Sequence, residues 1–179
     1  EKMLYYGNSL LLSFITDLYY RPKVTAALSE NYPLGLPTSG IHHNIFTMED
    51  LFAGVTSKIA ELDALESPFF SYIHIFPPHH PYRPQKDFAG MFDHDGYKPI
   101  AKHMHVLSDD VSQSRLDEER NSYDAFVANL DMEIGRLIAA LQKQGILDHT
   151  YFIIASDHGE MFERGVYGHI TPLLYEPVI

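Results

Sequence analysis

The stretch "YDAFVANLDMEIGRLIAALQKQGILDHTYFIIASDHGE", residues 123–160, decides the fold class of this chain. Apolar side chains recur at helical spacing through its first part, so we predict one long amphipathic helix from about residue 116 to residue 144. Gly145 is a natural terminator, because glycine readily adopts the left-handed conformation that ends many helices. The apolar run "TYFIIAS", residues 150–156, follows closely and predicts a buried strand.

A second helix and strand precede this unit. Thr47 with Glu49 and Asp50 predicts a helix start, since threonine caps the first turn and acidic residues favour its positive end. Apolar residues at helical spacing then predict a helix over about 48–63. "PFFSYIHIF", residues 68–76, is short, aromatic and β-branched, and predicts a second buried strand.

The order of these elements predicts the fold class. Helix, strand, long loop, helix and strand is the alternation of an α/β fold with a mainly parallel sheet flanked by helices. No internal repeat or domain boundary is visible, so we expect one domain over 1–179. The chain begins like the interior of a longer product and stops within the strand-like "LLYEPVI", so we expect the sheet to be incomplete at both ends.

Composition narrows the possible partners. The chain has 13 Lys and Arg against 24 Asp and Glu, which disfavours nucleic-acid binding, because that requires a basic surface. It has no Cys, which excludes disulfides, zinc–thiolate sites and a cysteine nucleophile within it. No apolar run approaches the roughly 20 residues that a membrane span needs, and no signal peptide is visible. Compartment and oligomeric state stay open.

Both predicted strands end in residues that can carry chemistry. Ligands of parallel sheets bind beyond the carboxyl ends of strands. Asp157 and His158 follow the second strand, and a turn at Gly159 would let both side chains face one divalent cation. Oxygen ligands suit Mg²⁺, Ca²⁺ or Mn²⁺, whereas imidazole favours Mn²⁺ or Zn²⁺. The alternative is an aspartate that caps a turn beside an exposed histidine.

Further candidate side chains lie in loops. His79 and His80 follow the first strand between prolines, which stiffen the backbone around them. His169 could donate a hydrogen bond to an oxyanion or provide a further metal ligand. Arg83 could contact an anion. For each of these residues, a solvated surface side chain is the alternative interpretation.

In this order, the pieces resemble the sulfatase family of the alkaline phosphatase superfamily. The resemblance rests on "SPFFSYIHIFPPHHPYRP" (67–84), on the helix–strand unit at 123–160 and on "GHITPLLYEPVI" (168–179). It is firm over 67–179 and weak over 1–66. It implies an alkaline phosphatase-like fold and a single partial sulfatase-like catalytic domain.

The resemblance also implies roles for individual residues. Asp157 and His158 would ligate one divalent metal ion. The resemblance favours Ca²⁺ over Mn²⁺ or Mg²⁺. His79 and His169 would contact the transferred group or the leaving oxygen of a small anionic ester, in a metal-dependent hydrolysis of sulfate esters. His158 stands where the family often has Asn, and His169 where many members have Lys.

Three alternatives stay open. The first is a phosphonate monoester or phosphodiester hydrolase, or a phosphoethanolamine- or phosphoglycerol-type transferase, on the same scaffold. His158 and His169 favour it. A degenerate, non-catalytic sulfatase-like binding module is the second, and a plain α/β domain with coincidental His and Asp residues is the third. The family's Cys/Ser-x-Pro-x-Arg nucleophile segment and its early acidic metal ligand are missing from this sequence. We therefore expect them upstream of Glu1, further strands beyond Ile179, and no activity from this chain alone.

Overall fold

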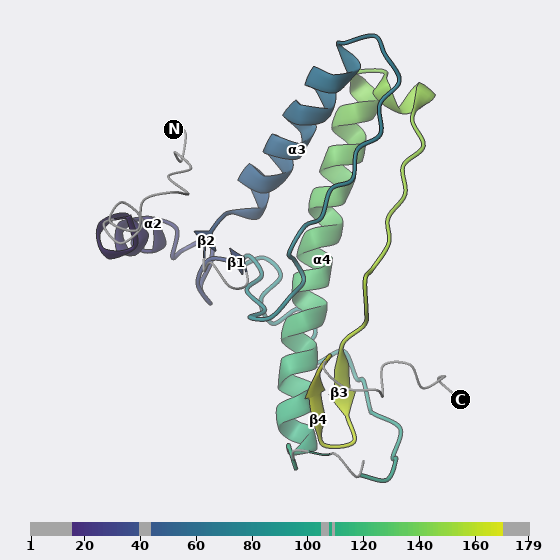
Figure 1. The fold of residues 1–179 in the computed structure, drawn as a ribbon. Coiled ribbons are helices and arrows are strands. Elements are labelled where there is room, and N and C mark those ends of the chain that lie inside the picture. Colours follow the sequence, from purple (N-terminus) through teal and green to yellow (C-terminus); the bar gives the residue numbers. More distant parts are fainter. Residues whose placement is uncertain (1–15, 40–43, 105–107, 109, 170–179) are drawn as a thin grey trace.

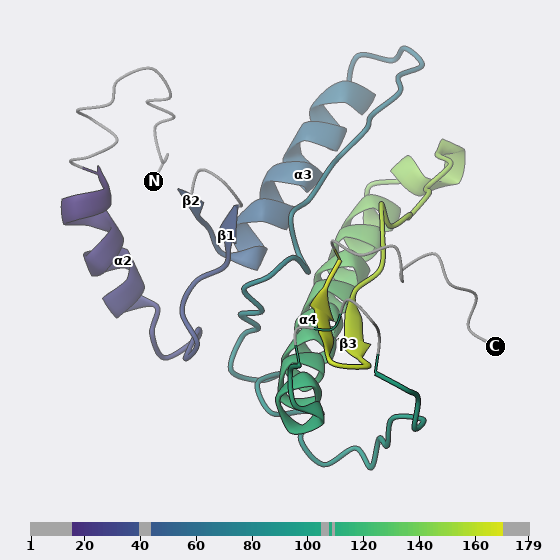
Figure 2. The ribbon, with the colours of Figure 1, turned by 60° about the horizontal axis from the view of Figure 1, so that its bottom comes forward.

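Two long helices form the centre of the molecule. The computed structural model describes residues 16–39, 44–104, 108 and 110–169. Within them, α3 (Met48–Asp63) and α4 (Gln113–Lys143) lie side by side and point the same way, and a long extended segment leads back from the end of each (Figures 1 and 2). None of the helices in this part of the chain is long and apolar enough to span a membrane.

The other elements are short. A π-helical turn at Thr16–Tyr20 leads into α2 (Arg21–Ala27), and a 3₁₀ turn at Ile146–His149 follows α4. The strands form two antiparallel pairs, β1 (Thr38–Ser39) with β2 (Asn44–Ile45), and β3 (Met161–Glu163) with β4 (Val166–Gly168).

The predicted helices are confirmed, and their ends follow from local chemistry. The hydroxyl of Thr47 accepts a hydrogen bond from the backbone N–H of Asp50 at 3.1 Å and starts α3 at the expected place. The side chain of Ser112 caps α4 in the same way, so that helix begins a few residues before the predicted start. Gly145, at φ +74°, ends it as predicted.

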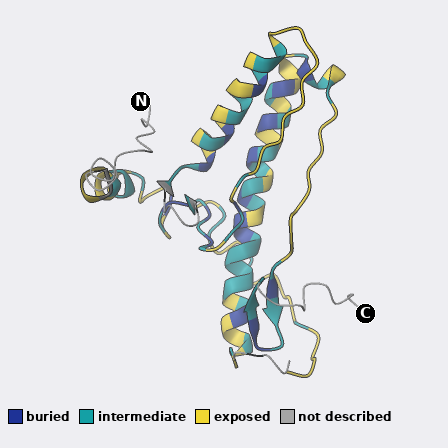
Figure 3. Cartoon of the chain, viewed as in Figure 1, coloured by how far each residue is buried: buried dark blue, intermediate teal, exposed yellow. Residues whose placement is uncertain are grey.

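The main core lies where α3, α4 and the turns beside them meet. Figure 3 shows buried residues on the facing sides of the two helices. Full burial of one such apolar side chain contributes about 1.5–3 kcal/mol to stability. The buried members of this cluster are Met48, Phe52, Ile59, Tyr82, Phe126, Leu137, Leu141 and Ile146.

The two predicted strands are extended segments without a sheet. Residues 68–76 and 150–156 run in the same direction, opposite to the helices, as the strands of a parallel sheet would (Figure 1). Within the described residues neither segment pairs with a strand, so the mainly parallel sheet that we predicted is not formed there; the ladders present are antiparallel. Phe70 and Ile153 are 91% and 87% exposed, because no neighbouring strand or helix covers these apolar side chains.

A β-hairpin that the sequence analysis did not predict follows the second segment. β3 and β4 are joined by Arg164 and Gly165, which have φ values of +59° and +74°. Two successive residues with positive φ make the tight turn that matches the twist of antiparallel strands. The short alternation in "MFERGVYG", with glycine at the second turn position, is the signal that could have identified it.

The long loop between the first extended segment and α4 is held to α4 by polar contacts. The side chain of Asn129, fully buried in α4, accepts a hydrogen bond from the backbone N–H of Gln85 at 3.0 Å and donates one to the Gln85 side chain at 3.0 Å. Farther along, Asp95 contacts Arg120 at 2.6 Å, and this hydrogen bond lowers the pKa of Asp95. The loop is therefore ordered against the helix although it has no regular structure.

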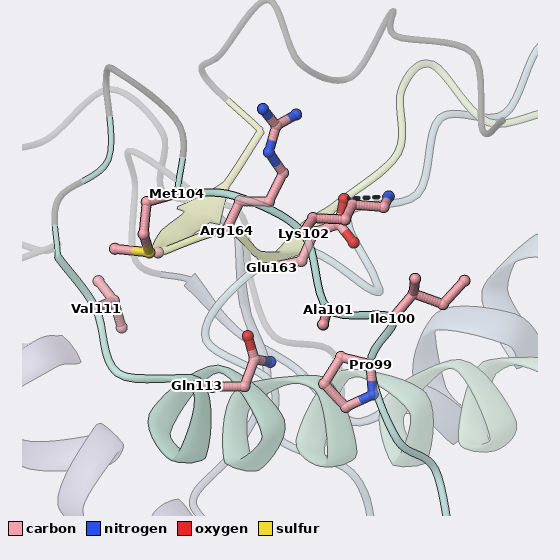
Figure 4. Close-up of a pocket in the computed structure, with 10 residues that line it drawn as sticks. Pro99, Ile100, Ala101, Lys102, Met104, Val111, Gln113, Glu163 and Arg164 are labelled. Carbon is pink, nitrogen blue, oxygen red and sulfur yellow. Dashed lines mark hydrogen bonds and ion pairs between the residues drawn. The ribbon is translucent and has the colours of Figure 1, made fainter.

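The tip of the β3–β4 hairpin is clamped by the end of that loop. Lys102 pairs with Glu163 at 2.8 Å, Arg164 Nε donates to the backbone carbonyl of His103 at 3.1 Å, and Ser108 Oγ donates to the Gly165 carbonyl at 3.1 Å. A cavity of about 270 Å³ lies between the loop, the hairpin tip and the start of α4 (Figure 4). These contacts fix one end of the hairpin.

The exposed apolar segments lead us to expect that the chain expressed alone associates with itself. Replacing Phe70, Tyr151 and Ile153 together by Ser should reduce the association, because these side chains supply much of the uncovered apolar surface. Size-exclusion chromatography with light scattering measures the effect, with Leu34→Ser, an exposed residue outside both segments, as control. A strictly monomeric wild-type chain at every concentration would contradict this prediction.

The hairpin clamp predicts that Gly165→Ala lowers stability. The new Cβ would collide with the hydroxyl of Ser108, and φ at this position is unfavourable for alanine, so we expect a loss of about 1–3 kcal/mol. Gly54→Ala is the matched control: it lies in α3 with no atom within 4 Å of the added Cβ, and should raise stability by about 0.5–1 kcal/mol. Thermal unfolding compares the two, and equal effects would refute the clamp.

Candidate active site

The ends of the two extended segments meet at the base of the hairpin. His79 follows the first segment, His158 follows the second, and His169 follows β4. The rings of His158 and His169 are stacked, with centroids 4.2 Å apart and planes at 23°. His79 approaches His169 edge-on at 5.3 Å. Three of the residues that the sequence analysis singled out thus form one cluster of imidazoles, with His169 at its centre.

His79 is held by its own loop. Its backbone N–H donates to the carbonyl of Phe76 at 3.0 Å, which closes a turn directly after the extended segment. The Phe76 ring lies 4.8 Å from the imidazole. The turn and the ring therefore fix both the backbone and the ring of His79 beside His169.

Aromatic packing joins this loop to the hairpin. Tyr82 is buried, and its ring contacts those of Tyr123 on α4 at 5.4 Å and Phe162 on β3 at 6.1 Å. His80 lies edge-on to Tyr167 of β4 at 5.9 Å. Because contacts of this kind stabilise by more than their area alone, they hold the His79 loop against the strands that carry His169.

Asp157 and His158 lie at the rim of the cluster. The Asp157 carboxylate is 68% exposed, and its Oδ2 lies 3.7 Å from Nε2 of His158. Desolvation is the largest single influence on Asp157 and opposes its ionisation, but backbone N–H groups and the neighbouring imidazoles outweigh it and lower its pKa. The carboxylate is therefore ionised at neutral pH and accessible.

The hydrogen bonds of the rings define which nitrogen is open. Nδ1 of His158 lies 2.8 Å from the carbonyl oxygen of Gly159, and Nδ1 of His79 lies 2.6 Å from that of His80. A carbonyl oxygen only accepts, so Nδ1 carries the proton in each case. In the neutral form, each ring therefore presents the lone pair of Nε2, the arrangement typical of metal-binding histidines.

A divalent cation fits Asp157 and His158 as part of its ligand set. Ligand atoms at 2.1–2.4 Å from such a cation lie roughly 3–3.5 Å from each other, close to the Oδ2–Nε2 separation. Both donor atoms are available and one is negatively charged. The described residues contain no group of three or more His, Asp or Glu side chains arranged to hold a metal, so a cation bound by these two would need further ligands.

No role was predicted for Glu160 from the sequence. Its side chain is only 5% exposed, and its two carboxylate oxygens each lie 3.3 Å from Nδ1 of His169. The pKa values of Tyr82 and Tyr123 are raised, first by burial of these two phenols and second by the negative charge of Glu160. Both phenols are therefore neutral. The buried carboxylate beneath an imidazole could be found only from the structure.

Two other expectations have different outcomes. Arg83 does not face the cluster: it donates to the backbone carbonyl of Leu36 at 2.9 Å and so holds another part of the fold. The segment "ITPLLYEPVI", residues 170–179, lies outside the described residues.

The cavity in Figure 4 lies at the tip of the hairpin, at the opposite end from His169.

Comparisons with known proteins find relatives among the sulfatases. A sequence profile described as "Sulfatase" matches residues 14–177. An arylsulfatase of Clostridium perfringens is 28% identical, over 55% of this chain and 25% of that protein. An endo-4-O-sulfatase of Bacteroides thetaiotaomicron is 33% identical, over 53% and 19%. A choline-sulfatase of Rhizobium meliloti is 26% identical, over 59% and 24%.

No solved structure matches the chain. The chain spans a quarter or less of the length of each of these curated relatives. The profile nevertheless covers nearly all of it, including α3, α4, the extended segments that follow them and the cluster of imidazoles. This chain therefore belongs to the sulfatase family, whose fold is of the alkaline phosphatase-like α/β class.

Proposed function

We propose that this chain supplies part of the active site of an enzyme that hydrolyses sulfate esters. The observation that carries the proposal is the convergence of His79, His158 and His169 where two extended segments end, in a chain of the sulfatase family. The relatives are named as sulfatases, which supports sulfate esters as the substrates. We infer a small anionic ester as the substrate class.

Each site residue has a specific role in this proposal. Asp157 and His158 hold one divalent metal ion, for which the family resemblance favours Ca²⁺ over Mn²⁺ or Mg²⁺. When bound, such an ion supplies positive charge to the ester oxygens. His79 and His169 use Nε2–H, when protonated, to donate hydrogen bonds to the non-bridging oxygens or to the leaving oxygen.

The net negative charge of the chain means that an anionic ester must be attracted by positive groups within the site itself. The chain carries a formal charge of −11, which opposes long-range attraction of an anionic ester. A bound cation and protonated imidazoles would overcome this repulsion at short range. Binding should therefore depend on the cluster itself.

A second candidate function is hydrolysis of phosphonate monoesters or phosphodiesters, or transfer of a phosphoethanolamine- or phosphoglycerol-type group. The feature that favours it is the presence of His158 and His169. By the family resemblance, these stand where sulfatases commonly have Asn and Lys. Parallel assays with 4-nitrophenyl sulfate and phenyl phosphonate monoesters discriminate between the two. Metal binding without turnover of either ester would instead favour a non-catalytic module.

Loss of one proposed metal ligand should lower activity strongly. In the full-length protein that contains this chain, we expect Asp157→Ala to lower kcat/KM for 4-nitrophenyl sulfate at least about 100-fold, because positive charge at the ester oxygens is lost. A chelator should have the same effect, reversible by added Ca²⁺ or Mn²⁺. Asp148→Ala, an exposed aspartate before the second extended segment, is the control. An active, metal-free Asp157→Ala protein would contradict the proposed role.

The isolated 179-residue chain should not turn over the same ester. It has no Cys, and none of its Ser residues lies in the nucleophile pattern of the family, so no group that could attack sulfur is identified within it. A colorimetric assay at high protein concentration tests this expectation. Turnover by the chain alone that disappears with Asp157→Ala would overturn it.

A further inference from the structure

The carboxylate of Glu160 lies at the base of the hairpin, outside every role described above. The register of β3 and β4 pairs Met161 with Gly168, so Glu160 and His169 are the next residues to face each other across the two strands. The tight turn at the other end of the hairpin determines this register. The pairing of carboxylate and imidazole is therefore a consequence of backbone geometry.

The burial of the Glu160 carboxylate makes its hydrogen bond to His169 important for the site. The Glu160 side chain is 5% exposed, and an ionised carboxylate removed from water needs a hydrogen-bond donor. Nδ1 of His169 lies 3.3 Å from both of its oxygens and is the donor that the described residues provide. On its other sides the His169 ring stacks on His158 and meets the edge of His79.

We propose that Glu160 is a positioning residue that orients the imidazole of His169 and fixes its proton on Nδ1. Accepting the Nδ1–H bond leaves Nε2 as the only nitrogen that can face a substrate. It also holds the ring in the plane that stacks on His158. The same division of the two nitrogens occurs in His79 and His158, where backbone carbonyls take the place of the carboxylate. The kinetic consequences of this proposal rest on the proposed sulfatase function.

The first test measures the His169 tautomer without any assay of activity. The full-length protein is labelled with ¹⁵N-histidine, and the His169 signals are assigned by comparison with His169→Gln. At alkaline pH, where the ring is neutral, we expect the proton on Nδ1 in the wild-type protein and in Glu160→Gln, which keeps an acceptor oxygen. Glu160→Leu should shift the population toward Nε2–H. A wild-type His169 protonated on Nε2 overturns the proposal, even if the leucine variant fails to fold.

The second test is a double-mutant cycle on turnover of 4-nitrophenyl sulfate. Glu160→Leu should lower kcat/KM about 10- to 100-fold, the range for loss of one hydrogen bond to a charged group. Glu160→Gln should lose less. In the His169→Ala background, Glu160→Leu should have no further effect, because Glu160 acts only through that ring. Effects that multiply would show a general structural role and refute the proposal.

A matched control is present on the same hairpin. Glu163 pairs with Lys102 at the hairpin tip, away from the imidazoles, so Glu163→Gln should leave both the tautomer and kcat/KM unchanged. If the wild-type protein hydrolyses no sulfate ester, the proposed function is contradicted, and the tautomer measurement alone then decides the role of Glu160. An Nδ1 proton that persists in a folded Glu160→Leu protein would refute that role.

Discussion

Apolar packing between α3 and α4 is the interaction on which the other placements in the chain depend. The buried side chains of Phe52, Phe126 and Leu137 hold the two helices side by side, pointing the same way. Each helix must then be followed by a segment that travels back along it. Those two return segments deliver His79 and His158 to the same region, so the meeting of the imidazoles follows from the packing of the helices.

The parts predicted well from the sequence are those governed by local chemistry. The Thr47 cap and the apolar stripe of α3 predicted its bounds, and Gly145 predicted the end of α4. Strand positions were predicted from β-branched and aromatic runs, but a sheet depends on partners distant in sequence. Residues 68–76 and 150–156 have no such partner among the described residues, so their predicted conformation is present without the predicted sheet.

The positions of His79 and His158 in the fold were predicted for the same reason, whereas their roles remain predictions. Each was expected after the carboxyl end of a strand, and in the structure both contact a common neighbour, His169. The role of Arg83 could not be judged, because the backbone carbonyl that it binds belongs to a distant loop. Glu160 was overlooked because the burial of its side chain depends on the hairpin, which no single residue in the sequence reveals.

The residues of the site differ in how far apart they lie along the chain. Glu160 and His169 are nine residues apart, and a two-residue turn brings them together, so this part can form locally and early. His79 joins it from about 90 residues away, which adds the entropic cost of closing a long loop. Residues 157–169 thus form a local part of the site. Its connection to His79 depends on the whole arrangement of helices, and is the part of the site that forms only with the complete fold.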